Sequence, residues 1–375
     1  MNHNHLAKDT NTNEIFKDLV VLELASVLAG PSVGLFFAEL GAKVIKVENA
    51  TTGGDVTRTW KISTEDPQYK TSAYYAAANW NKETLFLDLK QEKDQNIIYD
   101  LLPQVDIVVA NFKDSAAQKM GMDANTLLQK NTKLIYANIS GFGENDKDRV
   151  AFDVVLQAES GIMYMNGQQA GPATKMPIAF IDILAAHQLK EGVLCALIQR
   201  MRTGKGSIVN VSLFDAAVAS LANQASTHLM TGFIPQRIGS LHPNIAPYGE
   251  QLNAEDGTTY VLAVGSNIQF QHLCELLNIP EVAKSPLYEN NYQRVKNRVT
   301  LLGYLQHAFK KIDHEVFYEK CHQMQVPIGK VRDLQAVFEL PAAQELILEQ
   351  AEKEDNIISK RVKTAVFNIQ YPNHS

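Results

Sequence analysis

Short apolar runs alternate with helical patterns through the first half of the chain, and this alternation limits the fold more than any other feature. The apolar runs are of strand length, while the segments between them have the residue pattern of helices. Strands that alternate with helices form a parallel sheet covered on both faces, which predicts an α/β protein. The predicted strands lie at 19–24, 43–47, 84–89, 106–112 and 133–139, and the predicted helices at 31–40, 94–102 and 124–130.

A long helix is predicted at 182–202, because this segment is rich in Ala, Leu, Gln and Glu. Thr203, Gly204 and Gly206 follow it directly and are expected to end it. A strand at 207–211 and a helix at 216–224 are predicted next, so the α/β pattern continues beyond the long helix.

The chain length and a later change of pattern predict two domains. The 375 residues exceed one ordinary core. A loop-like stretch around His242, Pro243 and Pro247 leads to a predicted strand at 259–264, and the sequence up to Met324 is mostly helical. We expect a disordered lead-in at 1–15, a large domain at 16–227 and a small domain at 228–330. The segment 331–375 is expected to return to the large domain, with a strand at 365–369.

The composition is that of an ordinary globular enzyme of a reducing compartment. The sequence is 45% hydrophobic and 20% charged, and its net charge of -6 argues against a nucleic-acid partner. Its three cysteines are widely spaced without a CxxC pair, and its histidines form no ligand pair, so neither disulfides nor a metal are expected. The polar N-terminus lacks the apolar stretch of a signal peptide and no run is long enough to cross a membrane, which predicts a cytoplasmic protein.

The opening strand–helix–strand unit invites a dinucleotide-binding interpretation. Glu48 ends the second predicted strand, where an acidic residue would hold a ribose. However, the loop 26–31 contains no GxGxxG, and Pro31 lacks the amide that a phosphate would need. The sequence therefore disfavours NAD or FAD, and Pro31 fits the first turn of a helix.

Two segments follow predicted strands at the edge where open α/β sheets bind ligands. Ser140-Gly141-Phe142-Gly143 brings backbone close to that edge, although a plain turn explains it equally well. Asn111-Phe112, with Lys119 shortly after, offers an amide, an aromatic ring and a cation. A strand end and a solvated lysine remain the simpler interpretation of the second segment.

Two aspartates are candidate catalytic groups. Asp182 stands at the start of the long helix, where the helix dipole should keep its carboxylate ionised. Asp153 follows Phe152 in a similar context. Both positions are also explained by a helix cap alone, and His187, one turn after Asp182, is expected to be structural.

Taken together, these segments resemble the class III CoA-transferases (the CaiB/BaiF family), which include formyl-CoA and carnitine CoA-transferases and α-methylacyl-CoA racemase. The resemblance extends from about residue 19 to 331 and rests on several motifs in the same order. They are Ala29-Gly30-Pro31, the run 40–48, Gly53-Gly54-Asp55 with Arg58, Asn81-Lys82, the run 87–90, Asn111-Phe112, Met120-Gly121, the run 140–143, Asp182 with the run 192–197, the run 203–206, the run 242–248 and the run 326–329.

This resemblance implies a Rossmann-like large domain, a smaller α+β domain, long linkers and an interlocked homodimer. It implies a CoA-transferase that acts on acyl-CoA and carboxylic acid substrates, without a permanently bound cofactor. Asp182 matches the family's nucleophile, which forms a mixed anhydride and then an aspartyl-CoA thioester. The positions that match the family's CoA contacts are Val27, Leu28, Ala29, Leu87, Lys90, Asn111, Phe112, Lys119, Met120, Ser140 and Phe142.

The chain departs from the family pattern at a few positions. Asn49 stands where many members have an arginine for the nucleotide phosphates, and Lys119 replaces a frequent arginine. The glycine-rich loop of formyl-CoA transferase is not evident, which disfavours an oxalate/formate specificity. Phe152 occupies the racemase histidine position and cannot accept a proton, so transfer is favoured over racemisation. A racemase and a non-catalytic CoA-binding protein remain the alternatives.

Overall fold

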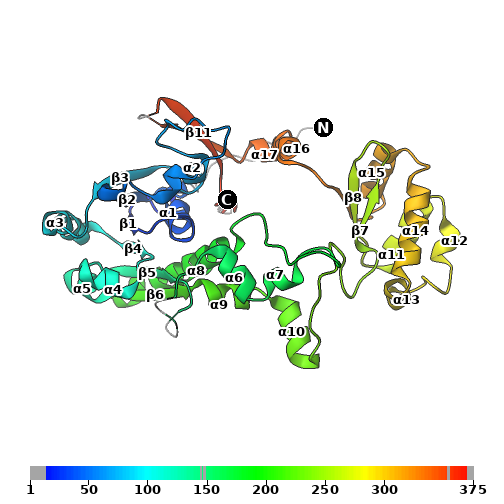
Figure 1. Cartoon of the computed structure of the whole chain (residues 1–375), viewed down its shortest axis with the longest axis horizontal. Coiled ribbons are helices and arrows are strands. Elements are labelled where there is room, and N and C mark those ends of the chain that lie inside the picture. The colour runs from blue at the N-terminus through cyan, green and yellow to red at the C-terminus, as the bar shows by residue number, and fades with distance from the viewer. Residues whose placement is uncertain (1–13, 144–145, 147–148, 353–354, 370–375) are drawn as a thin grey trace, which may run out of the picture. The chain divides into compact units, whose positions relative to one another are not determined.

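The computed structural model describes residues 14–143, 146, 149–352 and 355–369. The chain divides into two compact units. The first contains the described residues up to 162, together with 175–233 and those from 345 onward. The second contains residues 163–174 and 234–344. Figure 1 labels the helices and strands of both.

A six-stranded parallel sheet forms the centre of the first unit (Figure 1), and the α/β prediction is confirmed. Its strand order is β3-β2-β1-β4-β5-β6. The chain therefore builds outward from β1 in one direction and then from β4 in the other, so that a switch point lies between these two strands. The strands are β1 (Val20–Leu24), β2 (Lys43–Asn49), β3 (Lys82–Leu87), β4 (Ile107–Ala110), β5 (Ile135–Ser140) and β6 (Ser207–Ser212).

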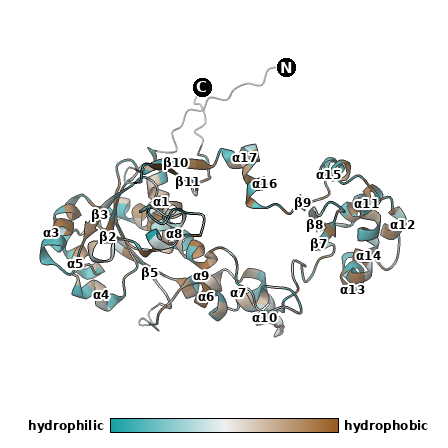
Figure 2. Cartoon of the chain, turned by 45° about the horizontal axis from the view of Figure 1, so that its top comes forward, coloured by the Kyte–Doolittle hydropathy of each residue, from teal (hydrophilic) through white to brown (hydrophobic). Residues whose placement is uncertain are grey.

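Helices cover both faces of this sheet because successive strand residues point to opposite sides. Val21 and Val109 join the core with α1 (Ala29–Glu39) and α8 (Phe180–Thr203). Leu22 and Val108 join a separate core with α3 (Glu92–Leu101) and α5 (Ala124–Lys130). Figure 2 shows the hydrophobic colour along the strands between these helices. The remaining helices of the unit are α2 (Ala73–Ala78), α4 (Asp114–Lys119), α6 (Asp153–Glu159), α9 (Leu213–Ala219) and α10 (Ala222–Thr231), while α7 (Ile162–Met165) begins at its boundary.

The long helix α8 confirms the sequence prediction and carries Asp182 in its first turn. Its inner face is a row of small and branched residues, including Ala185, Leu189 and Val193. Gly204 ends the helix in a left-handed conformation with φ 69°, and its amide donates to the Arg200 carbonyl at 2.8 Å.

The second unit has its own antiparallel sheet and helical core. The sheet has the order β7-β8-β9, formed by β7 (Tyr248–Asn253), β8 (Thr259–Ala263) and β9 (Ile328–Lys330). Tyr260, Phe270 and Phe309 are buried where helices pack on it. Those helices are α11 (Asn267–Leu276), α12 (Pro280–Ala283), α13 (Asn291–Lys296), α14 (Arg298–Phe309) and α15 (His314–Gln323), and the unit also includes α16 (Leu334–Phe338) and α17 (Pro341–Gln344).

The last part of the chain, from residue 345, belongs to the first unit, but it has no strand at 365–369, so that prediction was wrong. The strands are instead the hairpin β10 (Ile347–Glu352) and β11 (Ile357–Val362). After the hairpin, the amide of Ala365 donates to the buried Glu39 carboxylate at 2.6 Å. Arg361 forms an ion pair with the same carboxylate. These bonds to a side chain take the place of the sheet ladder that the apolar pattern suggested.

The structure bears on two of the sequence expectations, the absence of disulfides and the absence of a membrane-spanning helix. All three cysteines are free thiols, with Cys274 and Cys321 buried and Cys195 exposed. Among the described residues, no helix is both long and apolar enough to span a membrane. The expected lead-in at 1–15 lies almost wholly outside the described residues.

Candidate active site

A cavity of about 340 Å³ opens at the carboxyl ends of β1, β4, β5 and β6, next to the switch point of the sheet. Ligands of open α/β sheets bind in this region, because the strand order reverses there and leaves a crevice. We call it the first cavity. It is lined by residues 26–29, 111–114, 138–141, 143, 149–152, 182, 210–213 and 215.

A second cavity of about 320 Å³ lies at the ends of β1, β2 and β3. Ser26 and Phe112 line both cavities, so the two are adjacent. Together they offer an elongated ligand a path along the carboxyl edge of the sheet. The second cavity is lined by residues 24–26, 46–49, 52, 54–56, 87–90, 112 and 120.

Reciprocal hydrogen bonds fix the strand ends between the two cavities. The Ser26 amide donates to Asn111 Oδ1 at 3.2 Å, and Asn111 Nδ2 donates back to the Ser26 carbonyl at 2.9 Å. Because this amide side chain meets both backbone groups of one residue, it joins the β1 loop to the end of β4. Asn111 therefore has a structural role in shaping the site.

Asp182 lies in the wall of the first cavity, in the first turn of α8. Only 8% of it is exposed. Burial raises the pKa of its carboxyl to about 7, and the nearby Asp153 carboxylate adds to the rise. No hydrogen bond to the carboxylate is found within the described part of the chain. The carboxyl of Asp182 therefore changes between its protonated and ionised forms near neutral pH.

The environment of Asp182 corrects two of the sequence interpretations. The N-cap position of α8 is Ala179, without a side-chain cap, so Asp182 is not a helix cap. The expectation that the carboxylate stays fully ionised was also wrong, because burial, with a contribution from Asp153, raises its pKa to about 7. A buried carboxyl without donors is unusual for a structural group and typical of functional sites.

Asp153 is held in place by two donors and supports the start of α8. Its Oδ1 accepts from the Ile181 amide at 2.7 Å, and its Oδ2 accepts from Gln157 Nε2 at 2.5 Å. Phe152 precedes it, is 54% exposed and lines the first cavity. Phe152 thus lies at the cavity without offering any basic group.

Most residues that were matched to CoA contacts lie along the two cavities. The first cavity collects Val27, Leu28, Ala29, Asn111, Phe112 and Ser140, and the second collects Leu87, Lys90, Phe112 and Met120. Lys119 and Phe142 line neither. Lys119 is the last residue of α4, and the ring of Phe142 packs against Phe214 with the Arg149 guanidinium 4.0 Å above it.

Glu48 does not fit the ribose-binding role. Arg58 donates to both of its carboxylate oxygens, at 2.7 and 2.8 Å, and the Tyr75 hydroxyl donates at 2.6 Å. The Asp55 amide adds a further bond at 2.8 Å. These donors lower the pKa of Glu48 against the effect of burial and occupy the oxygens that a ribose would need.

Several polar residues of the cavities were not identified from the sequence as site residues. Arg149 lines the first cavity and pairs with Glu159. Asp215 lines the same cavity, and Asp55 lines the second. Among these, only Asp55 had a signal, since it follows the paired glycines of the Gly53-Gly54-Asp55 motif. Within the described part of the chain, no cluster of three or more His, Cys, Asp or Glu side chains is placed to hold a metal.

Gly54 is required at its position, and its replacement gives a sharp test of the Glu48 network. Its φ is 103°, and an added Cβ would lie 2.3 Å from Glu48 Oε2. We expect Gly54→Ala to lower the free energy of unfolding by roughly 2–4 kcal/mol, measured by denaturant titration. The matched control is Gly53→Ala, where φ is 79° but nothing lies within 4 Å, so only about 1 kcal/mol should be lost. Equal losses in the two variants would contradict the crowding at Glu48.

The strand order and the two cavities define an α/β protein with adjacent cavities at the carboxyl edge of its sheet, where proteins of this class bind ligands. Comparison with known proteins then specifies the family. The model of CoA-transferase family III matches residues 16–370. The chain is 35% identical to a succinate–glutarate CoA-transferase of Agrobacterium fabrum, over 94% of this chain and 89% of that protein. It is 33% identical to an acetyl-CoA:oxalate CoA-transferase of Acetobacter aceti, over 87% and 83%.

The solved structures agree with this assignment. A CaiB/BaiF family protein of Brucella suis superposes with a TM-score of 0.81 and 33% identity, covering 96% of this chain and 93% of that one. The chain belongs to CoA-transferase family III. The predicted family and the predicted class of enzyme, a CoA-transferase, are both confirmed.

Proposed function

We propose that the chain is an acyl-CoA:carboxylate CoA-transferase that works through a covalent intermediate on Asp182. The observation that carries this proposal is the buried Asp182 carboxyl in the wall of the first cavity, with a pKa of about 7 and no hydrogen-bond donor among the described residues. A carboxylate with few hydrogen bonds and little solvation is more nucleophilic than one in water. Near neutral pH a substantial fraction of Asp182 is ionised and available for attack.

The proposed reaction exchanges one thioester for another. An Asp182 oxygen attacks the thioester carbonyl carbon, and the carbon–sulfur bond breaks. CoA departs as the thiolate, and the acyl group remains on Asp182 as a mixed anhydride. The thiolate then attacks the aspartyl carbonyl, which frees the first acid and leaves an aspartyl-CoA thioester. The acceptor carboxylate attacks this thioester to form a new anhydride and release the thiolate. Attack of the thiolate on the acceptor's acyl carbon then yields the new acyl-CoA and regenerates Asp182.

The two cavities suggest how CoA would lie. We place its nucleotide end in the second cavity and its thioester in the first, with the pantetheine arm passing Ser26 and Phe112. The exposed ammonium of Lys90 is available for a phosphate, because Asn49 offers no cation and its side chain is bonded to Thr51. The oxygens of the thioester and of the acceptor acid would then lie beside Asp182.

A product survey tests the function as a whole. The relatives are named for succinate, glutarate and oxalate, so these short dicarboxylates are the first acceptors to offer. We expect mass spectrometry to detect a new acyl-CoA when the enzyme receives succinyl-CoA or acetyl-CoA with such an acid. CoA binding without any transfer across a broad panel of donors and acids would indicate a non-catalytic CoA-binding protein.

Exchange of the α-hydrogen separates transfer from racemisation. Phe152 offers no base to the cavity, and both Asp153 oxygens already accept hydrogen bonds. We expect no deuterium in a chiral 2-methylacyl-CoA after incubation with the enzyme in deuterated water, while CoA transfer to an acid proceeds. Deuterium incorporation without any transfer would assign the protein to the racemase type.

We also propose the interlocked homodimer that the family resemblance implies, together with the cytoplasmic location that the sequence predicts. Exposed apolar residues of the first unit support an assembly: Leu229 and Met230 on α10 are 82% and 84% exposed, and Phe233 is 53% exposed. Light scattering at micromolar concentration should give twice the chain's 41.7 kDa, without a monomer on dilution. A folded monomer under native conditions would rule out linked chains, which separate only by unfolding.

A further inference from the structure

Val27 has a backbone conformation that valine rarely adopts, and it lies where the two cavities meet. Its φ is 73°, in the left-handed region that strongly disfavours β-branched residues. It follows Ser26, which lines both cavities, and itself lines the first. Outliers of this kind persist only where neighbouring groups hold them.

Asp55 accepts hydrogen bonds from the backbone amide of Val27. The Val27 amide donates to both oxygens of the Asp55 carboxylate, at 3.2 Å to Oδ2 and 3.4 Å to Oδ1. Lys46 Nζ lies 3.1 Å from the same Oδ2, and its side chain is fully buried. The charge of Lys46 lowers the pKa of Asp55 against the effect of burial. The carboxylate therefore stays ionised and accepts from the strained amide.

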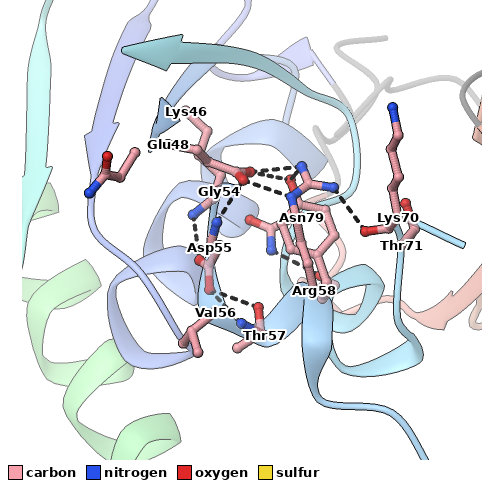
Figure 3. A network of polar contacts seen from close by, with 12 residues as sticks. Lys46, Glu48, Gly54, Asp55, Val56, Thr57, Arg58, Lys70, Thr71 and Asn79 are labelled. Atoms are coloured by element: carbon pink, nitrogen blue, oxygen red, sulfur yellow. Dashed lines mark hydrogen bonds and ion pairs between the residues drawn. The ribbon is translucent and has the colours of Figure 1, made fainter. Parts of the chain in front are cut away.

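The network behind Asp55 fixes its position. Its amide donates to Glu48 Oε2, which also accepts from Arg58 (Figure 3). Figure 3 shows Asp55 between this pair and Thr57, whose hydroxyl donates to Asp55 Oδ1 at 2.8 Å. The two oxygens thus have different main partners. Oδ1 accepts from Thr57 and caps the short 3-10 helix η3 (Val56–Thr59). Oδ2 accepts the shorter bond from Val27 and forms the ion pair with Lys46.

We propose that Asp55 is a positioning residue for CoA, which acts by holding Val27 in its left-handed conformation. This inference rests on the proposed CoA site. Without the carboxylate, Val27 would relax toward a negative φ, and the 26–29 loop would leave its place at the junction of the cavities. CoA would then lose the surface along which it passes from one cavity to the other.

The substitution Asp55→Asn isolates this role. The amide side chain that it introduces keeps one acceptor oxygen, which can still cap the helix at Thr57. Its NH2 group would then face two donors, the Val27 amide and the Lys46 ammonium, and would accept from neither. The direction of the change in CoA affinity is also informative. Removing a negative charge from the cavity wall would by itself strengthen the binding of an anionic ligand such as CoA. Weaker CoA binding therefore reports the lost anchor and not the changed charge.

The experiment measures the affinity for free CoA by calorimetry in variants of the full chain. We expect Asp55→Asn to bind CoA at least tenfold more weakly than the wild type. Thr57→Val removes a bond to the other oxygen of the same carboxylate, so it should lose stability and keep its CoA affinity. Glycine adopts a positive φ without strain, so Asp55→Asn should cost less than threefold when it is made in a Val27→Gly background.

The outcomes separate the inference from the function on which it rests. Failure of the wild type to bind CoA would overturn the proposed function, and the inference with it. A wild type that binds CoA no more tightly than Asp55→Asn would overturn the inference alone. Should Asp55→Asn not fold, the comparison in the Val27→Gly background decides, since a tenfold loss there shows that Asp55 does not act through the Val27 conformation.

Discussion

Replacement of Asp182 by alanine is expected to abolish CoA transfer while the protein remains folded. Transfer needs a carboxylate oxygen at this point of the first cavity, and alanine removes it without adding bulk. We expect kcat to fall by about four orders of magnitude or more, as for the loss of other covalent nucleophiles. The measurement is the rate of new acyl-CoA formation, with CoA affinity followed in parallel. A variant that keeps more than about a tenth of wild-type turnover would contradict the nucleophile assignment.

Controls for this variant follow from the burial of Asp182. The matched variant is Asp123→Ala, which removes a real helix cap, bonded to the Thr126 amide at 3.1 Å and outside the lining of both cavities. It should lose about 1 kcal/mol of stability and keep its activity.

By contrast, Asp182→Asn should lose activity and gain stability at pH 8. Because the native pKa of about 7 exceeds that of the unfolded chain, the wild type loses on the order of 4 kcal/mol of stability between pH 4 and 8.

The fold of the first unit was largely predictable because the central strands of its large sheet are buried on both faces. Such strands are mostly apolar, as in 19–24 and 43–47, and the structure places β1 and β2 there. The charged residues within them, Glu23 and Lys46, are buried and form an ion pair with each other.

The two small sheets, β7-β8-β9 and β10-β11, were harder to predict. β7 mixes buried and exposed residues, and β10 has only half-buried and exposed ones. Both strands include Glu and Gln, so they lack a continuous apolar run. Ala365 belongs to the core, although Val366 and Phe367 after it are exposed, and its amide donates to an acidic side chain and not to a strand.

The site was only partly predictable, since its chemistry depends on burial. The sequence places Asp182 at a helix start, where the dipole alone would stabilise the charged form. Its raised pKa results from surrounding residues that are distant in the chain, among them Asp153. Local sequence carries no measure of that desolvation, so the residue was identified by family resemblance and its environment only by the structure.

The role of Asp55 was beyond prediction from local sequence for a related reason. Nothing in the residue type of Val27 indicates a left-handed backbone, because valine avoids it. The partner that holds it comes from a separate loop after β2. Positive φ is usually found at glycine. Here Gly53 and Gly54 have a positive φ in the loop that carries Asp55, whereas the residue with positive φ at the junction of the cavities is Val27.

The pH dependence of transfer should show an acid limb that belongs to Asp182. The reacting form is the carboxylate, and burial together with Asp153 raises its pKa to about 7. We therefore expect the rate of the first half-reaction to rise about tenfold per pH unit below pH 7 and to level off above it. Trapping the aspartyl intermediate with hydroxylamine, in rapid mixing at each pH, measures this step without the acceptor acid.

Asp153→Asn should move this limb to lower pH. The substitution removes the negative charge beside Asp182, while an amide oxygen at the Oδ1 position can still accept from the Ile181 amide, 2.7 Å away in the wild type. Burial is the larger cause of the raised pKa and is unchanged, so the limb should shift only partway toward the ordinary value for an aspartate. The matched control is Asp123→Asn, which removes the same charge outside the lining of both cavities and should leave the limb in place. A limb that stays at the same pH in Asp153→Asn, or one that moves up, would show that a group other than Asp182 controls the rate.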